Sequence, residues 1–329
     1  MPKNKDKEDK TKRIACLGGG NAMPKTVIAG LKKKDIKLSV ICAMLDSGGS
    51  TGRLREDYNI ISPGDIKRAF IALANTSPVI KNLFDYRFQT GELEGHSFAN
   101  LFIAALELSS NDYERTLKEL NKLLNVRHQV LPATLTKSHL YAELENGKIV
   151  KGETNIDVPK HDDSLKIKKV YLKPEAKAYP ESVKALTKAD LIVLGPGDLY
   201  SSLAQILLTK GIARAMRESD AKVVYICNLM RKRGETNRFN VQDFVGVIEK
   251  YLEGEVDHVI FNTQKPSKKR IKEHKARHPE LLSLVQYKEE LLKKDKYIGK
   301  KIIKNKGPIV HDPHKLANTI LKILNNNEN

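Results

Sequence analysis

The densest group of chemically useful residues follows the second predicted strand. The segment reads Asp46-Ser47-Gly48-Gly49-Ser50-Thr51-Gly52-Arg53-Leu54-Arg55. A carboxylate at the end of a strand can bind a ribose hydroxyl or a metal ion. The glycine N–H groups and the hydroxyls can donate hydrogen bonds to a phosphate, and arginine can bind it with two N–H groups at once. We therefore predict a phosphate-binding segment here, and the alternative is a flexible surface loop.

A second predicted phosphate site is the glycine turn Gly18-Gly19-Gly20-Asn21, which follows the first predicted strand. Glycines let a phosphate approach the backbone closely, and the next helix offers free N–H groups at its positive end. The turn is neither a complete G-x-G-x-x-G motif nor a P-loop. A tight strand–helix turn that needs glycine for packing is the alternative.

The turn Gly195-Pro196-Gly197 also lies between an apolar strand and a helix, which makes it a third predicted anion site. Tyr200 follows it and could stack on a base or bind a sugar hydroxyl, or it could simply pack at the start of the helix. Asn228 ends the next predicted strand, and we expect it near the base or the sugar.

Three residues are candidates for catalysis, namely Asp46, Asp65 and His96. Asp65 is equally well explained as an acid in the first turn of a helix after a Pro-Gly turn. His96 and Asn100 are four residues apart and should share a helix face. His96 could polarise a substrate, or it could be satisfied by the backbone. The chain has no Ser-His-Asp order and no zinc-ligand spacing.

The elements that must position these residues alternate between apolar strands and amphipathic helices. Strands are predicted at 13–17, 38–45, 190–195, 222–228, 256–262 and 300–304, with helices between most of them. This rhythm predicts an α/β fold, a Rossmann-like doubly wound, mostly parallel sheet. The middle of the chain adds an inserted helical region and a β-hairpin subdomain. Ligands of such sheets bind at the carboxyl ends of the strands, where all the turns above lie.

The predicted domain organisation is simple. Residues 1–12 form a disordered basic N-terminus, and residues 13–329 form one nucleotide-binding domain with an inserted hairpin region at about 130–175. The turn Asn146-Gly147, flanked by alternating apolar and polar residues, predicts the hairpin itself.

The net charge of +18 first suggests a polyanionic partner. Most of the excess lies in residues 265–306, which hold 15 Lys and Arg against 5 Asp and Glu. This lysine-rich segment lies between a strand and a helix of the fold, so we expect solvated surface there and no nucleic-acid partner. No run is apolar enough to span a membrane, and the N-terminus does not read as a signal peptide. We therefore expect a cytoplasmic protein without a membrane partner.

Several motifs occur in an order and spacing that resemble a known family. They are GGGNAM, LDSGGSTGRLR, SPGDIKRAF, GHSFANLFIAAL, LNVRHQVLPAT, GPGDLYSSL, ICNLMRKRGET and HDPHKLA. Together they cover about residues 13–325. The chain resembles the CofD-like superfamily and, within it, the YvcK branch of gluconeogenesis factors.

The resemblance implies a Rossmann-like domain that binds a nucleotide. The YvcK branch binds UDP-sugars such as UDP-N-acetylglucosamine and is linked to carbon metabolism and to cell-wall and cell-shape control, with no firmly assigned reaction. The enzyme branch, the 2-phospho-L-lactate transferases, joins a phospholactyl group from a guanylyl donor to a deazaflavin acceptor with a divalent metal. We expect a UDP-sugar-binding regulator, and the alternatives are such a transferase and a nucleic-acid-binding protein. The protein could form a homo-oligomer.

The chain departs from the branch at three motifs. Asn21-Ala22 replaces Thr-Gly, Asp46-Ser47 replaces a pair of aspartates, and Ala99 replaces a glycine. Asp46 remains a candidate ligand for Mg²⁺, although loss of the second acid weakens that expectation. We expect the turns at 18–20, 48–53 and 195–197 to hold a diphosphate.

Overall fold

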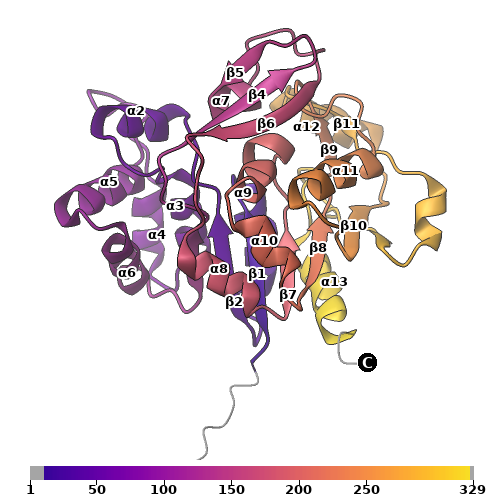
Figure 1. The fold of residues 1–329 in the computed structure, drawn as a ribbon, viewed down its shortest axis with the longest axis horizontal. Coiled ribbons are helices and arrows are strands. Elements are labelled where there is room, and N and C mark those ends of the chain that lie inside the picture. Colours follow the sequence, from indigo (N-terminus) through magenta and orange to yellow (C-terminus); the bar gives the residue numbers. More distant parts are fainter. Residues whose placement is uncertain (1–10, 327–329) are drawn as a thin grey trace, which may run out of the picture.

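The computed structural model describes residues 11–326, so nearly all of the predicted disordered N-terminus lies outside it. A central sheet has the strand order β12-β10-β8-β7-β1-β2-β3, and every neighbouring pair is parallel (Figure 1). The strands are β1 (Arg13–Gly18), β2 (Lys37–Cys42), β3 (Gln129–Pro132), β7 (Leu191–Leu194), β8 (Lys222–Ile226), β10 (His258–Asn262) and β12 (Tyr297–Lys300). The predicted fold class is confirmed.

Helices cover both faces of this sheet because successive strand residues point to opposite sides. In β1, Ile14 and Cys16 pack in one core, and Ala15 and Leu17 pack in the other. The first core is covered by η1 (Pro24–Ile28), α1 (Ala29–Leu31), α3 (Gly64–Leu73), α6 (Tyr113–Leu123) and α13 (Pro313–Asn325). The second is covered by α8 (Pro180–Thr187), η2 (Leu199–Ala204), α9 (Gln205–Leu207), α10 (Ile212–Arg217) and α11 (Val241–Leu252).

The inserted region contains both predicted parts. Its helices are α2 (Gly49–Tyr58), α4 (Pro78–Asp85) and α5 (Phe98–Ser110), alongside α3 and α6. Its small antiparallel sheet has the order β5-β4-β6, formed by β4 (His139–Leu144), β5 (Ile149–Lys151) and β6 (Ile167–Lys173), with α7 (Glu153–Asp157) after β5. Figure 1 shows this small sheet lying across the carboxyl ends of the central strands.

Three details differ from the sequence-based expectation. The segment after β2, for which a flexible loop was the alternative, becomes helical at Gly49, so residues 49–55 lie on α2. The strand β3, at the edge of the central sheet, begins where the inserted hairpin was expected. The strand expected at 300–304 lies at Tyr297–Lys300 instead, since the buried Ile302 and Ile303 fill a turn rather than continue the strand.

The lysine-rich segment is a folded part of the molecule. It contains α12 (Lys268–Arg277), β11 (Leu281–Leu284), η3 (Glu289–Lys293) and β12, and β11 pairs with the short strand β9 (Met230–Lys232). The three cysteines are buried and free. None of the helices within residues 11–326 combines the length and hydrophobicity that crossing a bilayer requires.

Gly30 allows α1 and α13 to pack closely together, because it has no side chain at their contact. A Cβ atom on Gly30 would lie 2.2 Å from the carbonyl oxygen of Pro313 and 2.9 Å from the Cβ atom of Ala317. We expect Gly30→Ala to lower the free energy of unfolding by about 1–3 kcal/mol, because both helices must shift to admit the methyl group. Urea denaturation measures this loss. Gly246→Ala in α11, where nothing lies within 4 Å, should be neutral or slightly stabilising, and equal losses in both variants would contradict the explanation.

Candidate functional site

A cavity of about 890 Å³ lies at the carboxyl ends of the strands. It spans the boundary between β1 and β7, from which the chain builds the sheet outward in opposite directions. Such a switch point leaves a crevice between the turns that follow the two strands, and ligands of open α/β sheets bind there. The chain thus forms a ligand-sized cavity where this fold class provides one.

Most of the predicted site residues line this cavity. They are Gly19, Gly20, Asn21, Asp46, Gly48, Gly49, Ser50, Thr51, Asp65, Asn100, Gly197 and Asn228. The predicted residues Gly18, Arg53, His96, Gly195 and Tyr200 are not among its lining residues. Residues from six separate turns and helices therefore meet in one place, as the carboxyl-end rule predicts.

The arginines and the tyrosine that were predicted to hold ligand are engaged elsewhere. Arg53 donates to the carbonyl oxygen of Glu94 at 2.7 Å, and Arg55 donates to the carbonyl oxygens of Asp46 and Ser138 at 3.0 and 2.9 Å. The Tyr200 side chain packs in the hydrophobic core and is 4% exposed. These three side chains position the neighbouring backbone and do not line the cavity.

Arg68, unlike Arg53 and Arg55, has a side chain that lines the cavity. It lies on α3, one turn after Asp65, and pairs with the carboxylates of Asp65 and Asp46, the latter at 3.6 Å. Asp65 also accepts a hydrogen bond from the Gly20 N–H at 2.8 Å. Burial raises the pKa of Asp65 to about 6, although Arg68 opposes this effect. The (i, i+3) spacing from Asp65 was the sequence signal that could have identified Arg68.

A polar network holds the first turn of α2. Asn100 donates to the hydroxyl oxygens of Ser50 and Thr51, both at 3.2 Å, and its own oxygen has no partner. His96 Nδ1 lies 3.0 Å from the Ser50 hydroxyl, and burial, followed by the charge of Arg53, lowers its pKa. His96 and Asn100 therefore act on the same hydroxyl, and His96 supports the cavity wall from behind.

The inserted sheet contributes α7 to the cavity, and this helix carries residues that the sequence did not single out. Glu153, Thr154 and Asp157 line the cavity. Ser47 donates its N–H to Glu153 at 3.4 Å, and its hydroxyl oxygen accepts the N–H of Thr154 at 3.1 Å. Burial, reinforced by the nearby Asp46, raises the pKa of Glu153 to about 8. Ser47 thus anchors the inserted sheet to the glycine segment.

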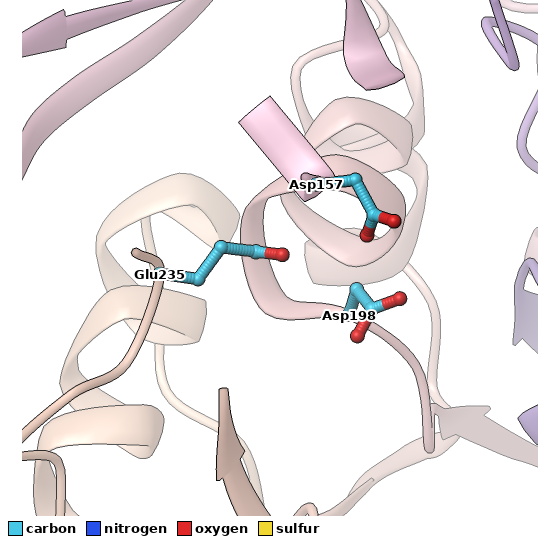
Figure 2. Close-up of side chains that lie close together, drawn as sticks. All are labelled: Asp157, Asp198 and Glu235. Atoms are coloured by element: carbon cyan, nitrogen blue, oxygen red, sulfur yellow. The ribbon is translucent and has the colours of Figure 1, made fainter. Parts of the chain in front are cut away.

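Three carboxylates beside the cavity surround one lysine. The side chains of Asp157, Asp198 and Glu235 come from three separate segments, and each offers an oxygen within 4.8 Å of the others (Figure 2). The ammonium group of Lys232 pairs with all three, at 3.3 Å from both Asp198 and Glu235. Burial raises the pKa of Glu235 to about 7. Burial opposes the charge on Lys232, but the carboxylates outweigh it and raise the pKa of this lysine.

The acidic groups of the cavity do not fit a divalent metal as they are arranged. Asp46 and Asp65 share the guanidinium of Arg68, and the carboxylates of the second group enclose Lys232. A cation supplied by the chain therefore lies between the carboxylates in each group. A Mg²⁺ ion would have to displace it and then meet near-ideal octahedral oxygen ligands.

The two ends of the cavity differ in chemistry. One end combines the glycine turns with the basic side chains of Lys25, Lys67, Arg68 and Arg87. Burial lowers the pKa of Lys67 to about 8. The other end is an apolar and imidazole wall that also includes the charged residues Glu280 and Lys304. Its other members are Leu229, Met230, His274, His278, Leu281, Pro308, Ile309, Val310 and His311. The lysine-rich segment supplies His274, His278 and Leu281, and the chain directly after it supplies residues 308–311.

Fold and cavity together define a Rossmann-like α/β protein with its cavity at the switch point of the sheet. The chain belongs to the CofD family and, within it, to the gluconeogenesis factors of the YvcK type. The family profile described as 2-phospho-L-lactate transferase CofD matches residues 14–306.

Similar proteins extend over most of the chain. The gluconeogenesis factor of Bacillus subtilis is 36% identical over 95% of this chain and 98% of its own length, and that of Listeria monocytogenes is 35% identical over 98% and 99%. A relative from Clostridium acetobutylicum is 37% identical, and the match spans only 60% of its length. A crystal structure of a UPF0052 family member from Bacillus halodurans superposes with a TM-score of 0.88 at 35% identity, covering 94% of this chain and 99% of that one.

Proposed function

We propose that this protein binds a nucleoside diphosphate sugar of the UDP-sugar type and regulates carbon metabolism and cell-wall or cell-shape processes. The observation that carries the proposal is the chemical division of one large cavity. Glycines and cations at one end suit a diphosphate, and the apolar and imidazole wall suits a base. The names of the relatives, gluconeogenesis factors, support the metabolic part.

The diphosphate would bind where the three glycine turns converge. Backbone N–H groups near Gly19, Gly49 and Gly197 can donate to phosphate oxygens without a side chain in the way, and Arg68 faces the same space. A Cβ atom on Gly19 would lie 2.5 Å from a carboxylate oxygen of Asp65, so this close approach requires glycine. Lys25 and Lys67 add charge without blocking the turn.

The sugar would lie against α7. Glu153, Asp157 and Asp198 line the cavity, and carboxylates accept hydrogen bonds from sugar hydroxyls. With its pKa raised to about 8, Glu153 carries a proton at neutral pH and can also donate one hydrogen bond. A neutral, hydroxyl-rich group suits this region better than a further phosphate does.

A regulatory role is favoured because each candidate for catalysis already has a structural partner. Asp46 and Asp65 pair with Arg68, and His96 supports Ser50 from outside the cavity. A general base needs a free lone pair within reach of the proton that it removes, and Asp46 and Asp65 line the cavity but already pair with Arg68, while His96 does not line it. We therefore infer binding without turnover.

Calorimetric titration with UDP-N-acetylglucosamine, UDP-glucose and UDP tests the proposal. We expect saturable binding with a dissociation constant below about 1 mM, still present after EDTA treatment because Lys25, Lys67 and Arg68 line the cavity and supply positive charge. Phosphorus NMR of the same mixtures should show no consumption of the ligand. Absence of binding by all three compounds would contradict the proposal, and metal-dependent turnover with a deazaflavin acceptor would establish the transferase alternative.

A further inference from the structure

Lys67 and Arg87 are cationic residues that line the cavity without an acidic partner. Arg68 differs from them, because the carboxylates of Asp46 and Asp65 both pair with it. Within residues 11–326, neither Lys67 nor Arg87 forms an ion pair with a carboxylate. The cavity therefore has two positive charges that the described part of the chain does not neutralise at contact distance.

The two side chains approach the same short segment, residues 95–97, just before α5. Lys67 comes from the first turns of α3, and its ammonium group donates to the Ser97 hydroxyl at 3.1 Å. Arg87 follows α4, its backbone pairs with that of Ser97, and its guanidinium donates to the carbonyl oxygen of Gly95. Each cation has only one such bond to a neutral oxygen, so N–H groups on both remain available to a ligand.

The electrostatics of Lys67 indicate that the arrangement suits an anion. Burial, followed by the charges of Arg68 and Arg87, lowers the pKa of Lys67 to about 8. The ammonium group still carries its proton at pH 7, so the fold holds like charges near one another beside a cavity. Lys25, which is exposed, can be satisfied by water alone, whereas Lys67 is half-buried. An anion bound between Lys67 and Arg87 would replace the lost hydration and relieve the repulsion.

This pair of cations lies next to the region that we assign to the sugar. Asp46 is a common neighbour, because its charge affects the pKa of both Lys67 and Glu153. The glycine turns and Arg68 already provide donors for a diphosphate, so the second pair of cations is free for another acidic group on the ligand. A single carboxylate suits the place better than a third phosphate, since the negative charge of Asp46 is close by.

We propose that Lys67 and Arg87 bind a carboxylate carried by the sugar, so that the preferred ligand is a UDP-sugar whose sugar is acidic. The inference rests on the proposed function and deepens it. The two oxygens of a carboxylate can accept hydrogen bonds from an ammonium and a guanidinium group together. A neutral sugar would leave both cations without a counter-charge.

Two pairs of UDP-sugars that differ by one carboxylate test the inference on the full wild-type chain. UDP-glucuronic acid has a carboxylate where UDP-glucose has a hydroxymethyl group, and UDP-N-acetylmuramic acid adds a lactyl carboxylate to UDP-N-acetylglucosamine. We expect the acidic member of at least one pair to bind about tenfold or more tightly than its neutral counterpart in calorimetry. The pair that shows this preference identifies the position of the carboxylate on the sugar.

The variants Lys67→Gln and Arg87→Gln locate the carboxylate. Each should reduce the ratio of acidic to neutral affinity about fivefold or more, and Lys67→Arg should keep most of it. Lys25→Gln removes a positive charge beside the first glycine turn and should weaken both members of a pair alike, so that their ratio stays as in the wild type. Arg87→Gln decides the matter if Lys67→Gln fails to fold, because Arg87 is exposed.

The outcomes separate the inference from the proposed function. If neither acidic sugar binds more tightly than its neutral counterpart, or if the ratio is unchanged in both glutamine variants, the inference is overturned and the proposed function stands. If none of the four UDP-sugars binds, the proposed function itself is overturned.

Discussion

Replacing Lys232 with methionine should destabilise the protein strongly. The change leaves Asp157, Asp198 and Glu235 close together with no cation between them. Removing one partner of a buried ion pair leaves an uncompensated charge, which typically lowers the free energy of unfolding by about 3–5 kcal/mol. Urea denaturation at pH 8 measures this loss.

The loss in Lys232→Met should shrink as the pH falls. Burial already raises the pKa of Glu235 to about 7 in the folded state, above its unfolded value, and removing Lys232 raises it further. A carboxyl group with a raised folded pKa destabilises the fold above that pKa, and protonation relieves the effect. Stability at pH 5 should therefore lie closer to that of the wild type than at pH 8. Lys168→Met, at an exposed pair with Glu143, should change stability by less than about 1 kcal/mol, and a pH-independent loss in Lys232→Met would argue against the explanation.

Replacing Arg68 with methionine should weaken UDP-sugar binding about 10- to 100-fold. Arg68 is the arginine that faces the glycine turns, and a charge-assisted hydrogen bond to phosphate contributes about 1.5–3 kcal/mol. The change also frees Asp46 and Asp65, whose negative charges would then repel the diphosphate. Calorimetry with UDP-N-acetylglucosamine measures the loss, and circular dichroism checks that the variant is folded.

Arg53→Met is the matched control for Arg68→Met. Arg53 lies in the segment with the richest sequence motif, but its guanidinium donates to the Glu94 carbonyl outside the cavity. We expect its replacement to change affinity by less than about threefold. A larger effect at Arg53 than at Arg68 would show that the ligand lies nearer the start of α5 than the cavity indicates.

The sequence predicted the sheet well because buried parallel strands are recognisable one at a time. Continuous apolar runs such as 38–45 and 190–195 need no partner to be identified. The edge strands β3 and β12 were missed or displaced, since their residues are short runs that become strands only through pairing with β2 and β10. Local pattern carries little information where a neighbouring strand determines the structure.

The residues of the candidate site were likewise predictable only where their position in the local pattern identified them. Gly19, Asp46, Asp65 and Asn228 were predictable because each follows a strand or begins a helix, and the fold class alone brings strand ends together. Arg68 was passed over in favour of Arg53, which lies closer to the glycines in sequence but not in space.

Glu153 gave no local signal, whereas Lys232 and His311 lie in the motifs ICNLMRKRGET and HDPHKLA, to which the sequence alone assigned no chemical role. Glu153 reaches the cavity on α7 of the inserted sheet, and His311 reaches it from the chain just after the lysine-rich segment. Lys232 pairs with Asp157, which lies 75 residues away in the sequence. Predicting such contacts requires the tertiary arrangement of three chain segments, which a single sequence does not provide.

The position of β12 gives the lysine-rich segment a role that does not involve a ligand. Beyond β12 the central sheet has no further strand among the described residues, so one edge of its backbone is unpaired. Open edges invite pairing with another chain and thereby aggregation, and natural proteins discourage this with lysines on or near the edge strand. Lys296, Lys300 and Lys301 occupy those positions. A few lysines of the lysine-rich segment thus lie where they discourage copies of this protein from joining edge to edge.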